Sequence, residues 1–322
     1  MTAPYRVLRQ HQRYDFSPDA RPALAVPDGA TIVFETLDCF SNLLTSPSQR
    51  FSREEDLLEV LGAYNPVAGP VHVRGARPGD VLAIAIEEIR LGAAAPRAVT
   101  VTFGSGSRYV SAECPGIPAE GDTKVCPIDD DGHVVFPTAR GSLRMPVRPM
   151  VGTVGTAPAQ RSASSLFYDR RHGGNIDCPL VTTGAVLYLP VNVPGALLAL
   201  GDVHALMGDG EITGTALETS ADVTVRIAVL PGKERHLELP HVDHGHWIGV
   251  VGCLAGTGIE GNLQAAMLEM HRRLLDEYGL DPADAYQLLG ATARVRVNQC
   301  VAPPQWSTVY AGVPRPTFET GT

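Results

Sequence analysis

The sequence predicts an α+β fold that is rich in β-strands. A sandwich- or barrel-like body is expected over residues 1–255, followed by a smaller helix–helix–strand part over 256–322. Two observations predict this class. The chain contains 33 glycines and 26 prolines, and short strands separated by Pro/Gly turns are typical of sandwiches and barrels. A long helical repeat of apolar residues occurs only after residue 260, so long helices are expected only in the C-terminal part.

Two similar turn-and-strand units occur in the first third of the chain. Residues 26–38 (VPDGATIVFETLD) and 77–89 (RPGDVLAIAIEEI) each begin with a Pro/Gly turn and continue as an alternating strand. Between them, residues 41–60 are predicted to form a polar loop and then a short helix, in which Ser52 and Glu55 fit a capping box. Both units are expected to belong to one β architecture.

Two further strands are predicted in the middle of the chain. Residues 129–136 (DDDGHVVF) indicate an Asp-Gly turn that leads into a strand. The acidic triplet lacks the spacing and the terminal glutamate of an EF-hand, so a solvated turn is expected there. Residues 223–230 (VTVRIAVL) alternate, and every second side chain is expected to face the core.

The C-terminal part contains the long helix. Apolar residues recur three, four and seven positions apart over 262–278, which predicts one buried helical face. Asn262 is expected to cap this helix and Gly279 to end it. A second helix is predicted over 281–290, and 293–301 is predicted to return as a strand.

Composition excludes several classes of function. Hydrophobic residues make up 44% of the chain and charged residues 19%, which is typical of a soluble globular protein. No apolar run is long enough to span a membrane, and the N-terminus lacks the apolar core of a secretory signal. A formal net charge of −9 without a basic run argues against nucleic-acid binding.

The spacing of the cysteines indicates the cellular compartment. They are scattered and form no CxxC pair, so free thiols in a reducing cytoplasm are expected. The six are Cys39, Cys114, Cys126, Cys178, Cys253 and Cys300.

Most of the polar residues that could carry chemistry lie between residues 172 and 230. Because unpaired buried charge costs several kcal/mol, such residues in an apolar stretch are expected to be paired, bound to metal or catalytic. The set consists of Asn175, Asp177, Asp202, His204, Glu211 and Glu218.

The spacing of these residues predicts a cluster. Side chains alternate along a strand, so Asp202 and His204 should share one face. Asp209-Gly210 predicts a two-residue hairpin that pairs His204 with Thr215, which puts Glu211 on the same face.

The two remaining acidic residues are expected to lie differently relative to this cluster. Asp177 is expected to arrive from the preceding Gly-rich loop. Glu218 should lie on the opposite face of the predicted hairpin, unless Gly214 marks a bulge that reverses the alternation.

The same stretch resembles the acetamidase/formamidase family. The family's ordered motifs are all present: GGN-x-D, P-V-x-V-P-G-A-L, G-D-x-H-A, G-D-G-E and G-x-A-x-E. Residues 65–80 and 145–159 also resemble family segments, whereas 90–145 do so less. Ala30 stands where the family usually has aspartate, which is a change within a turn. The resemblance implies hydrolysis of a small aliphatic amide to a carboxylate and ammonia, a divalent metal and a homo-oligomer.

The metal implied by the resemblance is expected first to be zinc, and a second ion such as Ca²⁺ is left open. Open zinc sites use three ligands from histidine and carboxylates plus water, and Asp177, Asp202 and His204 could supply them. The family also has an acidic residue in the segment that matches ETLD, so Asp38 is a further candidate ligand. The alternative for Asp38 is a strand-end aspartate that closes a turn.

The chemistry of amide hydrolysis suggests roles for the other residues. A metal lowers the pKa of a bound water and polarises the carbonyl. Glu211 is then the expected general base, which transfers a proton to the departing ammonia. Glu218 is the alternative base or a partner that holds His204, and Asn175 could donate a hydrogen bond to the oxyanion.

Alternatives to this mechanism remain open from the sequence. Cys178 could act as a nucleophile, although a cysteine that only packs is commoner. The chain could also be a β-rich protein with a structural metal and no hydrolase activity. The histidines at 236, 241, 244 and 246 could hold a metal, lie at the surface or border the pocket with Trp247. Formamide and acetamide differ by one methyl group, worth roughly 1–3 kcal/mol, so the substrate is also open.

Overall fold

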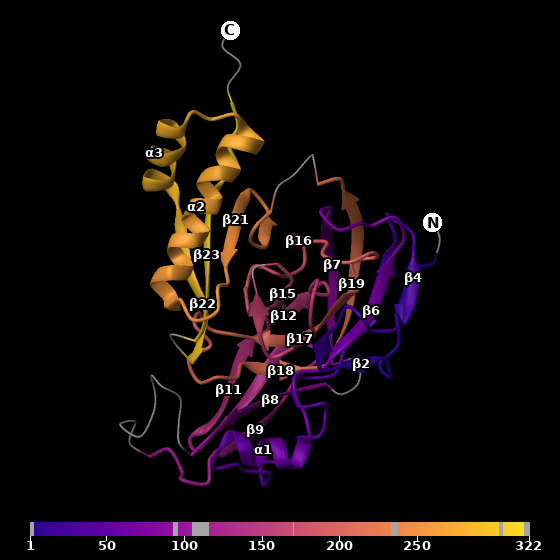
Figure 1. Cartoon of the computed structure of the whole chain (residues 1–322). Coiled ribbons are helices and arrows are strands. Elements are labelled where there is room, and N and C mark those ends of the chain that lie inside the picture. Colours follow the sequence, from indigo (N-terminus) through magenta and orange to yellow (C-terminus); the bar gives the residue numbers. More distant parts are fainter. Residues whose placement is uncertain are drawn as a thin grey trace.

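The computed structural model describes residues 3–92, 96–104, 116–169, 171–232, 237–302 and 305–318. Two large sheets dominate this part of the chain (Figure 1). The nine-stranded sheet runs in the order β1 (Tyr5–Val7), β5 (Thr31–Glu35), β19 (Ala221–Leu230), β7 (Val81–Leu91), β16 (Ala185–Pro190), β20 (His241–His244), β21 (Trp247–Gly252), β23 (Trp306–Pro314) and β22 (Arg294–Ala302).

The second sheet has ten strands and carries most of the candidate residues. Its main path is β14 (Tyr168–Asp169), β15 (Gly173–Asn175), β12 (Met150–Gly155), β17 (Leu198–Leu206), β18 (Leu217–Thr219), β8 (Arg97–Thr102) and β9 (Asp122–Pro127). Beside β17 lies β6 (Val67–Val73), which also pairs with β2 (Gln12–Arg13) and β4 (Leu24–Val26). Two small pairs complete the strands: β3 (Asp15–Phe16) with β13 (Ala163–Ser164), and β10 (His133–Thr138) with β11 (Gly141–Pro146).

The two sheets share one hydrophobic core. Phe34 and Val225 of the nine-stranded sheet belong to the same buried cluster as Val151 and Leu200 of the ten-stranded sheet. Apolar faces therefore pack against each other across the interface, as in a β-sandwich. The predicted α+β, β-rich class is confirmed.

The two predicted turn-and-strand units flank a common neighbour. β5 and β7 both pair with β19, the strand predicted from the alternation at 223–230. The short helix α1 (Glu54–Leu61) forms where expected, but its capping box was predicted one residue too early. The backbone N–H of Arg53 donates to the Asp56 carboxylate at 2.9 Å, because the helix begins at Glu54.

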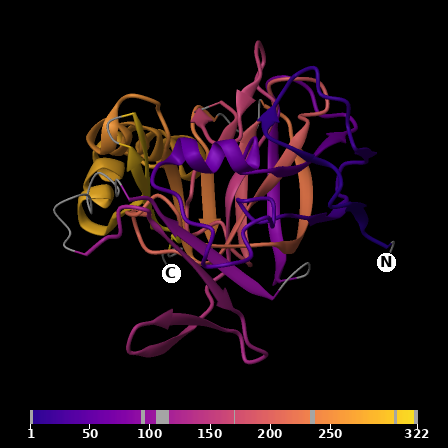
Figure 2. The same cartoon turned by 90° about the horizontal axis from the view of Figure 1, so that it is seen from below.

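The predicted Asp-Gly turn at 129–132 leads into β10. Arg144 of β11 pairs with Asp129 at 2.7 Å and with Asp131 at 2.6 Å, so part of the acidic triplet is neutralised by arginine. Figure 2 shows this hairpin extending away from the body.

The C-terminal helices cover one end of the nine-stranded sheet. α2 (Gly258–Tyr278) buries Ala266, Met270 and Leu274, and α3 (Pro282–Thr292) follows it. Gly279 ends α2 in the left-handed conformation, as predicted. The expected N-cap was wrong, because the helix begins four residues earlier and Asn262 is buried inside it, bonded to Leu254.

β22 and β23 extend the nine-stranded sheet beyond β21, with Val251 opposite Tyr310. A domain boundary at residue 255 stays a prediction. None of the three described helices combines the length and apolar character needed to cross a membrane.

Candidate functional site

His204 lies at the centre of a buried cluster of carboxylates. It sits on β17, eight of whose nine residues are buried. Its Nε2 atom is 3.1 Å from Glu218 Oε2, 3.4 Å from Asp202 Oδ1 and 4.0 Å from Asp177 Oδ1. The structure therefore brings three of the predicted carboxylates together around the Nε2 atom of His204.

Glu218 reaches the cluster through a strand pairing that differs from the predicted one. His204 lies directly opposite Glu218 in the antiparallel pair of β17 and β18, and residues opposite each other project from the same face. The predicted pairing of His204 with Thr215 was wrong. Glu218 faces the cluster because a register shift between His204 and Leu206 reverses the alternation. The alternative with a bulge gave the right face but put the bulge at Gly214.

The Asp209-Gly210 turn does form, but no hairpin extends from it. The N–H of Glu211 donates to the carbonyl of Gly208, which closes the turn. Gly210 then forms a bridge with Gln299 of β22 rather than a ladder with β17, and Asp209 pairs with Arg296 at 2.5 Å. The turn is held by a distant strand, which short-range patterns could not predict.

Three of the acidic residues have an uncommon backbone conformation. The φ angles of Asp177, Asp202 and Glu211 are +44°, +57° and +43°. A positive φ is unfavourable for residues with a Cβ atom and is concentrated at functional sites. These positions are therefore held by their surroundings, as expected of a binding or catalytic site.

Amide and hydroxyl groups hold the carboxylates in place. Gln299 donates to Asp177 Oδ2 at 3.0 Å, and Thr153 donates to Asp202 Oδ2 at 3.1 Å. With its NH₂ group turned towards the carboxylates, Asn175 donates to Asp202 Oδ2 at 2.9 Å and to Asp177 Oδ2 at 3.2 Å. Sequence reasoning missed Gln299 and Thr153; the consecutive amides Asn298 and Gln299 in an alternating strand were the available signal.

The electrostatics of the cluster are dominated by negative charge. Burial raises the pKa of Asp177 and of Glu211 well above the usual range, and neighbouring carboxylates add to the effect. Burial also raises the pKa of Glu218. Desolvation opposes the charged form of His204, but Glu218 and Asp202 outweigh it and raise its pKa. The cluster therefore favours a bound cation or added protons.

The donor set and its spacing fit a metal ion. Asp177, His204 and Glu211 each offer a ligand atom within 4.8 Å of the others. Bonds of about 2.0 Å to tetrahedral zinc put neighbouring ligand atoms roughly 3.3 Å apart. His204 Nε2 is 3.1 Å from Glu218 and 3.4 Å from Asp202, which is close to this value, and 4.0 Å from Asp177. Asp177 Oδ1 is buried and accepts no hydrogen bond from the described residues. A hard cation could satisfy it.

A second group of possible ligands includes a residue that sequence reasoning missed. Cys39 lies with Asp202 and Glu218, and burial raises the pKa of its thiol. Its neighbour Asp38 is outside both groups. Asp38 Oδ1 instead accepts the N–H groups of Phe40 and Asn42, and burial raises its pKa to about 6. These contacts match the turn-closing alternative for Asp38.

The segment that contains His241, His244 and His246 lies outside the carboxylate cluster around His204. His241 is buried on β20, with Nε2 3.3 Å from Glu269 Oε1 of α2. His244 ends β20 and His246 lies in the tight turn before β21. Neither belongs to a possible metal group among the described residues. His236 lies outside the residues that the structure describes.

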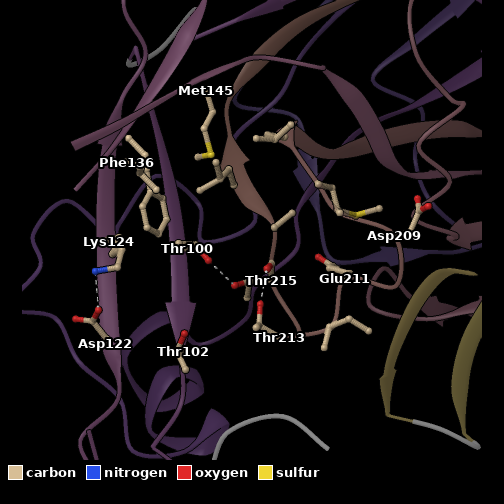
Figure 3. A pocket seen from close by; sticks show the side chains of 17 residues that line it. Thr100, Thr102, Asp122, Lys124, Phe136, Met145, Asp209, Glu211, Thr213 and Thr215 are labelled. Carbon is tan, nitrogen blue, oxygen red and sulfur yellow. Dashed lines mark hydrogen bonds and ion pairs between the residues drawn. The ribbon is translucent and has the colours of Figure 1, made fainter. Parts of the chain in front are cut away.

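A pocket of about 490 Å³ opens beside the cluster, and Glu211 is part of its wall. Figure 3 shows Glu211 and Asp209 on one side of the pocket and Lys124 and Asp122 on the other. Asp177, Asp202, His204 and Glu218 are not on this wall and are each at least 96% buried. Glu211 therefore connects the buried cluster with the pocket.

If Asp177 and Asp202 hold a metal ion, Gly152→Ala is expected to weaken its binding without removing a carboxylate. Val151 and Thr153 pair with Val203 and Gly201, so Gly152 lies opposite Asp202. An added Cβ would lie 2.5 Å from Asp177 Oδ1 and 2.7 Å from Asp202 Oδ2, and both carboxylates would have to move. Loss of correct ligand positioning lowers metal affinity roughly 10–100-fold. A competition titration with a zinc chelator can measure the affinity of both proteins for zinc.

Gly290→Ala is the matched control for this prediction. Gly290 lies in α3 with nothing within 4 Å of an added Cβ. Its zinc affinity should equal that of the unmodified protein. Equal affinity for Gly152→Ala as well would show that these carboxylates do not bind the ion.

Comparison with known proteins relates the chain to one enzyme family. The model of the Acetamidase/Formamidase family matches residues 4–166 and 159–320. The chain is 30% identical to an acetamidase of Bacillus halodurans, whose crystal structure matches with a TM-score of 0.84 over 96% of this chain and 97% of that chain. An acetamidase of Yersinia enterocolitica is 27% identical, with a TM-score of 0.84 over 97% and 92% of the two chains.

The curated relatives match over shorter segments. An acetamidase of Mycolicibacterium smegmatis is 27% identical over 174 residues, which are 43% of this chain and 41% of that protein. The chain spans at most 64% of the length of the curated relatives that it matches.

Proposed function

Because this chain belongs to the acetamidase/formamidase family, we propose that it is a metal-dependent hydrolase of small amides. The reaction adds water across the C–N bond of a primary amide and releases a carboxylate and ammonia. One observation carries the proposal beyond the family match: four buried carboxylates and one histidine form a cluster beside a pocket.

Asp177, Asp202 and His204 would hold the metal, for which zinc is the first choice, and Glu218 is close enough to join them. A bound metal would polarise the amide carbonyl and lower the pKa of a water molecule. A second ion could use the group formed by Cys39, Asp202 and Glu218. The sulfur ligand favours zinc over Ca²⁺ there, because Ca²⁺ takes oxygen ligands. Asp38 is left out of this ligand set because its carboxylate closes a turn.

Glu211 is proposed as the general base. It lies on the pocket wall and within 4.8 Å of Asp177 and His204 ligand atoms. Its carboxylate would take a proton from the attacking water and return it to the leaving nitrogen. Glu218 is better suited to holding His204, because its Oε1 atom also accepts the N–H of Ala216 at 2.8 Å.

Asn175 is proposed to orient the cluster and to stabilise charge near it. Its amide can donate to both Asp177 and Asp202. One of its two amide hydrogens could turn from a carboxylate to the oxyanion that develops on the carbonyl oxygen.

Cys178→Ala is expected to retain full turnover. Cys178 is fully buried, and burial raises the pKa of its thiol to about 12. A protonated, inaccessible thiol is a poor nucleophile. Steady-state rates of ammonia release for both proteins test this, and a drop of 100-fold or more in the variant would favour the thiol mechanism instead.

Removal of metal should abolish ammonia release reversibly. The test compares formamide, acetamide, propionamide and bulkier amides on protein treated with a chelator and on the same protein with zinc restored. Loss and recovery of activity would support the proposal. Metal binding without hydrolysis of any amide would instead favour a β-rich protein with a structural metal.

We also propose a cytoplasmic homo-oligomer. Cys39, Cys126 and Cys178 are buried free thiols, which suits a reducing compartment. Cys114 lies outside the described residues. Light scattering on the purified protein gives the oligomeric state directly.

A further inference from the structure

The pocket beside Glu211 is larger than a formamidase or acetamidase needs. Its volume is about 490 Å³. One water molecule occupies about 30 Å³ of liquid, so acetamide, with four non-hydrogen atoms, needs only roughly 100 Å³. Pockets that bury larger organic ligands have volumes of about 300–1,000 Å³.

Apolar side chains form most of the pocket wall. They come from strands β10 and β11, from the end of β17 and from the segment 207–217. The apolar residues are Phe136, Leu143, Met145, Leu206, Met207, Ile212, Ala216 and Leu217. Leu143 is 56% exposed and Ile212 is 36% exposed. Large apolar side chains that remain exposed around a concavity are typical of a binding site.

Five of the polar residues on the wall are paired with each other. Lys124 pairs with Asp122 at 3.0 Å, and the hydroxyl groups of Thr100 and Thr215 are 3.0 Å apart. Thr213 donates to the carbonyl of Thr215 at 3.2 Å. Figure 3 shows Lys124 and Asp122 on the far side of the pocket from Glu211, with the paired threonines between them. The pocket therefore offers apolar contact to a ligand, with the Glu211 carboxylate at one side.

We propose that this pocket binds the acyl group of the substrate, and that the preferred substrates are primary amides with an apolar acyl chain longer than acetyl. This inference rests on the proposed amide hydrolysis, because it puts the scissile carbonyl at Glu211 and the chain among the apolar residues. Burial of each added methylene is worth about a fourfold gain in kcat/KM. A longer chain therefore gains transition-state binding that formamide cannot obtain.

The test measures kcat/KM of the zinc-loaded protein for acetamide, butanamide and hexanamide. The value is expected to rise at least tenfold from acetamide to hexanamide. Ile212→Trp and Leu143→Trp fill the pocket from two different elements, and each is expected to lower the hexanamide-to-acetamide ratio at least tenfold. Leu268→Trp is the control, because Leu268 is 62% exposed on α2 and does not line the pocket.

The outcomes separate this inference from the proposed function. A series that is flat or falls with chain length would overturn the inference, while hydrolysis of the short amides would leave the proposed function standing. A rising series that neither tryptophan variant changes would also overturn it, because the chain would then bind elsewhere. If no amide is hydrolysed, calorimetric titration with hexanamide decides. Binding that is weakened at least tenfold by Ile212→Trp and unchanged by Leu268→Trp supports the pocket, and no binding overturns it.

Discussion

Glu211→Gln is expected to lower kcat for ammonia release by roughly 10²–10⁴-fold, the usual contribution of general acid–base catalysis. Glutamine has the shape of glutamate but cannot accept the proton of the attacking water. The substitution also removes a carboxylate whose pKa is raised by burial, so the free energy of unfolding should not fall. Single-turnover kinetics and thermal unfolding of the same preparation measure both effects.

Two measurements make this result specific to a base. The zinc content of Glu211→Gln should match that of the unmodified protein, because the proposed ligand set is Asp177, Asp202 and His204. Glu120→Gln, at an exposed carboxylate paired with Arg50, should leave kcat unchanged. A variant at Glu211 that loses its zinc would identify Glu211 as a ligand rather than the base.

His204→Gln is expected to remove both the metal and the activity. The imidazole is the only nitrogen donor in the two ligand groups found among the described residues. The loss of turnover should exceed the roughly 10–100-fold that outer partners of a ligand contribute. Zinc analysis after gel filtration, together with ammonia release, tests this expectation, and circular dichroism establishes that the variant is folded.

A second variant and a control complete this test. Asp202→Asn removes the charge of another proposed ligand with little change of shape, and it should lose zinc as well. His244→Gln is the matched histidine control, because His244 pairs with Trp247 at the end of a hairpin and outside both ligand groups. If His204→Gln retains zinc, or if His244→Gln loses it, the result would indicate that the metal binds in the segment containing His241, His244 and His246.

Several elements could be predicted because their causes are local. The alternation at 223–230 predicted β19, since a strand with one buried face repeats every two residues. Gly279 could be predicted to end α2, because glycine readily adopts the left-handed conformation found there. The family motifs also identified the buried acidic residues and His204 as one set.

Other features depended on contacts between distant segments. The Asp209-Gly210 turn was predicted, but its capture by Gln299 of β22 was not, because the two segments are about 90 residues apart and meet only in the folded chain. The hydrogen bond from Gln299 to Asp177 could not be predicted for the same reason, nor could the grouping of Cys39 with Asp202 and Glu218.

Local patterns in this chain therefore determined the types of element, the β-rich class and the identity of the polar residues. Tertiary structure decided their register, their partners and the size of the pocket. The physical reason is the range of the forces involved. Turn and alternation preferences act over a few residues, whereas the positive φ angles of Asp177, Asp202 and Glu211 are imposed by packing and hydrogen bonds from other strands.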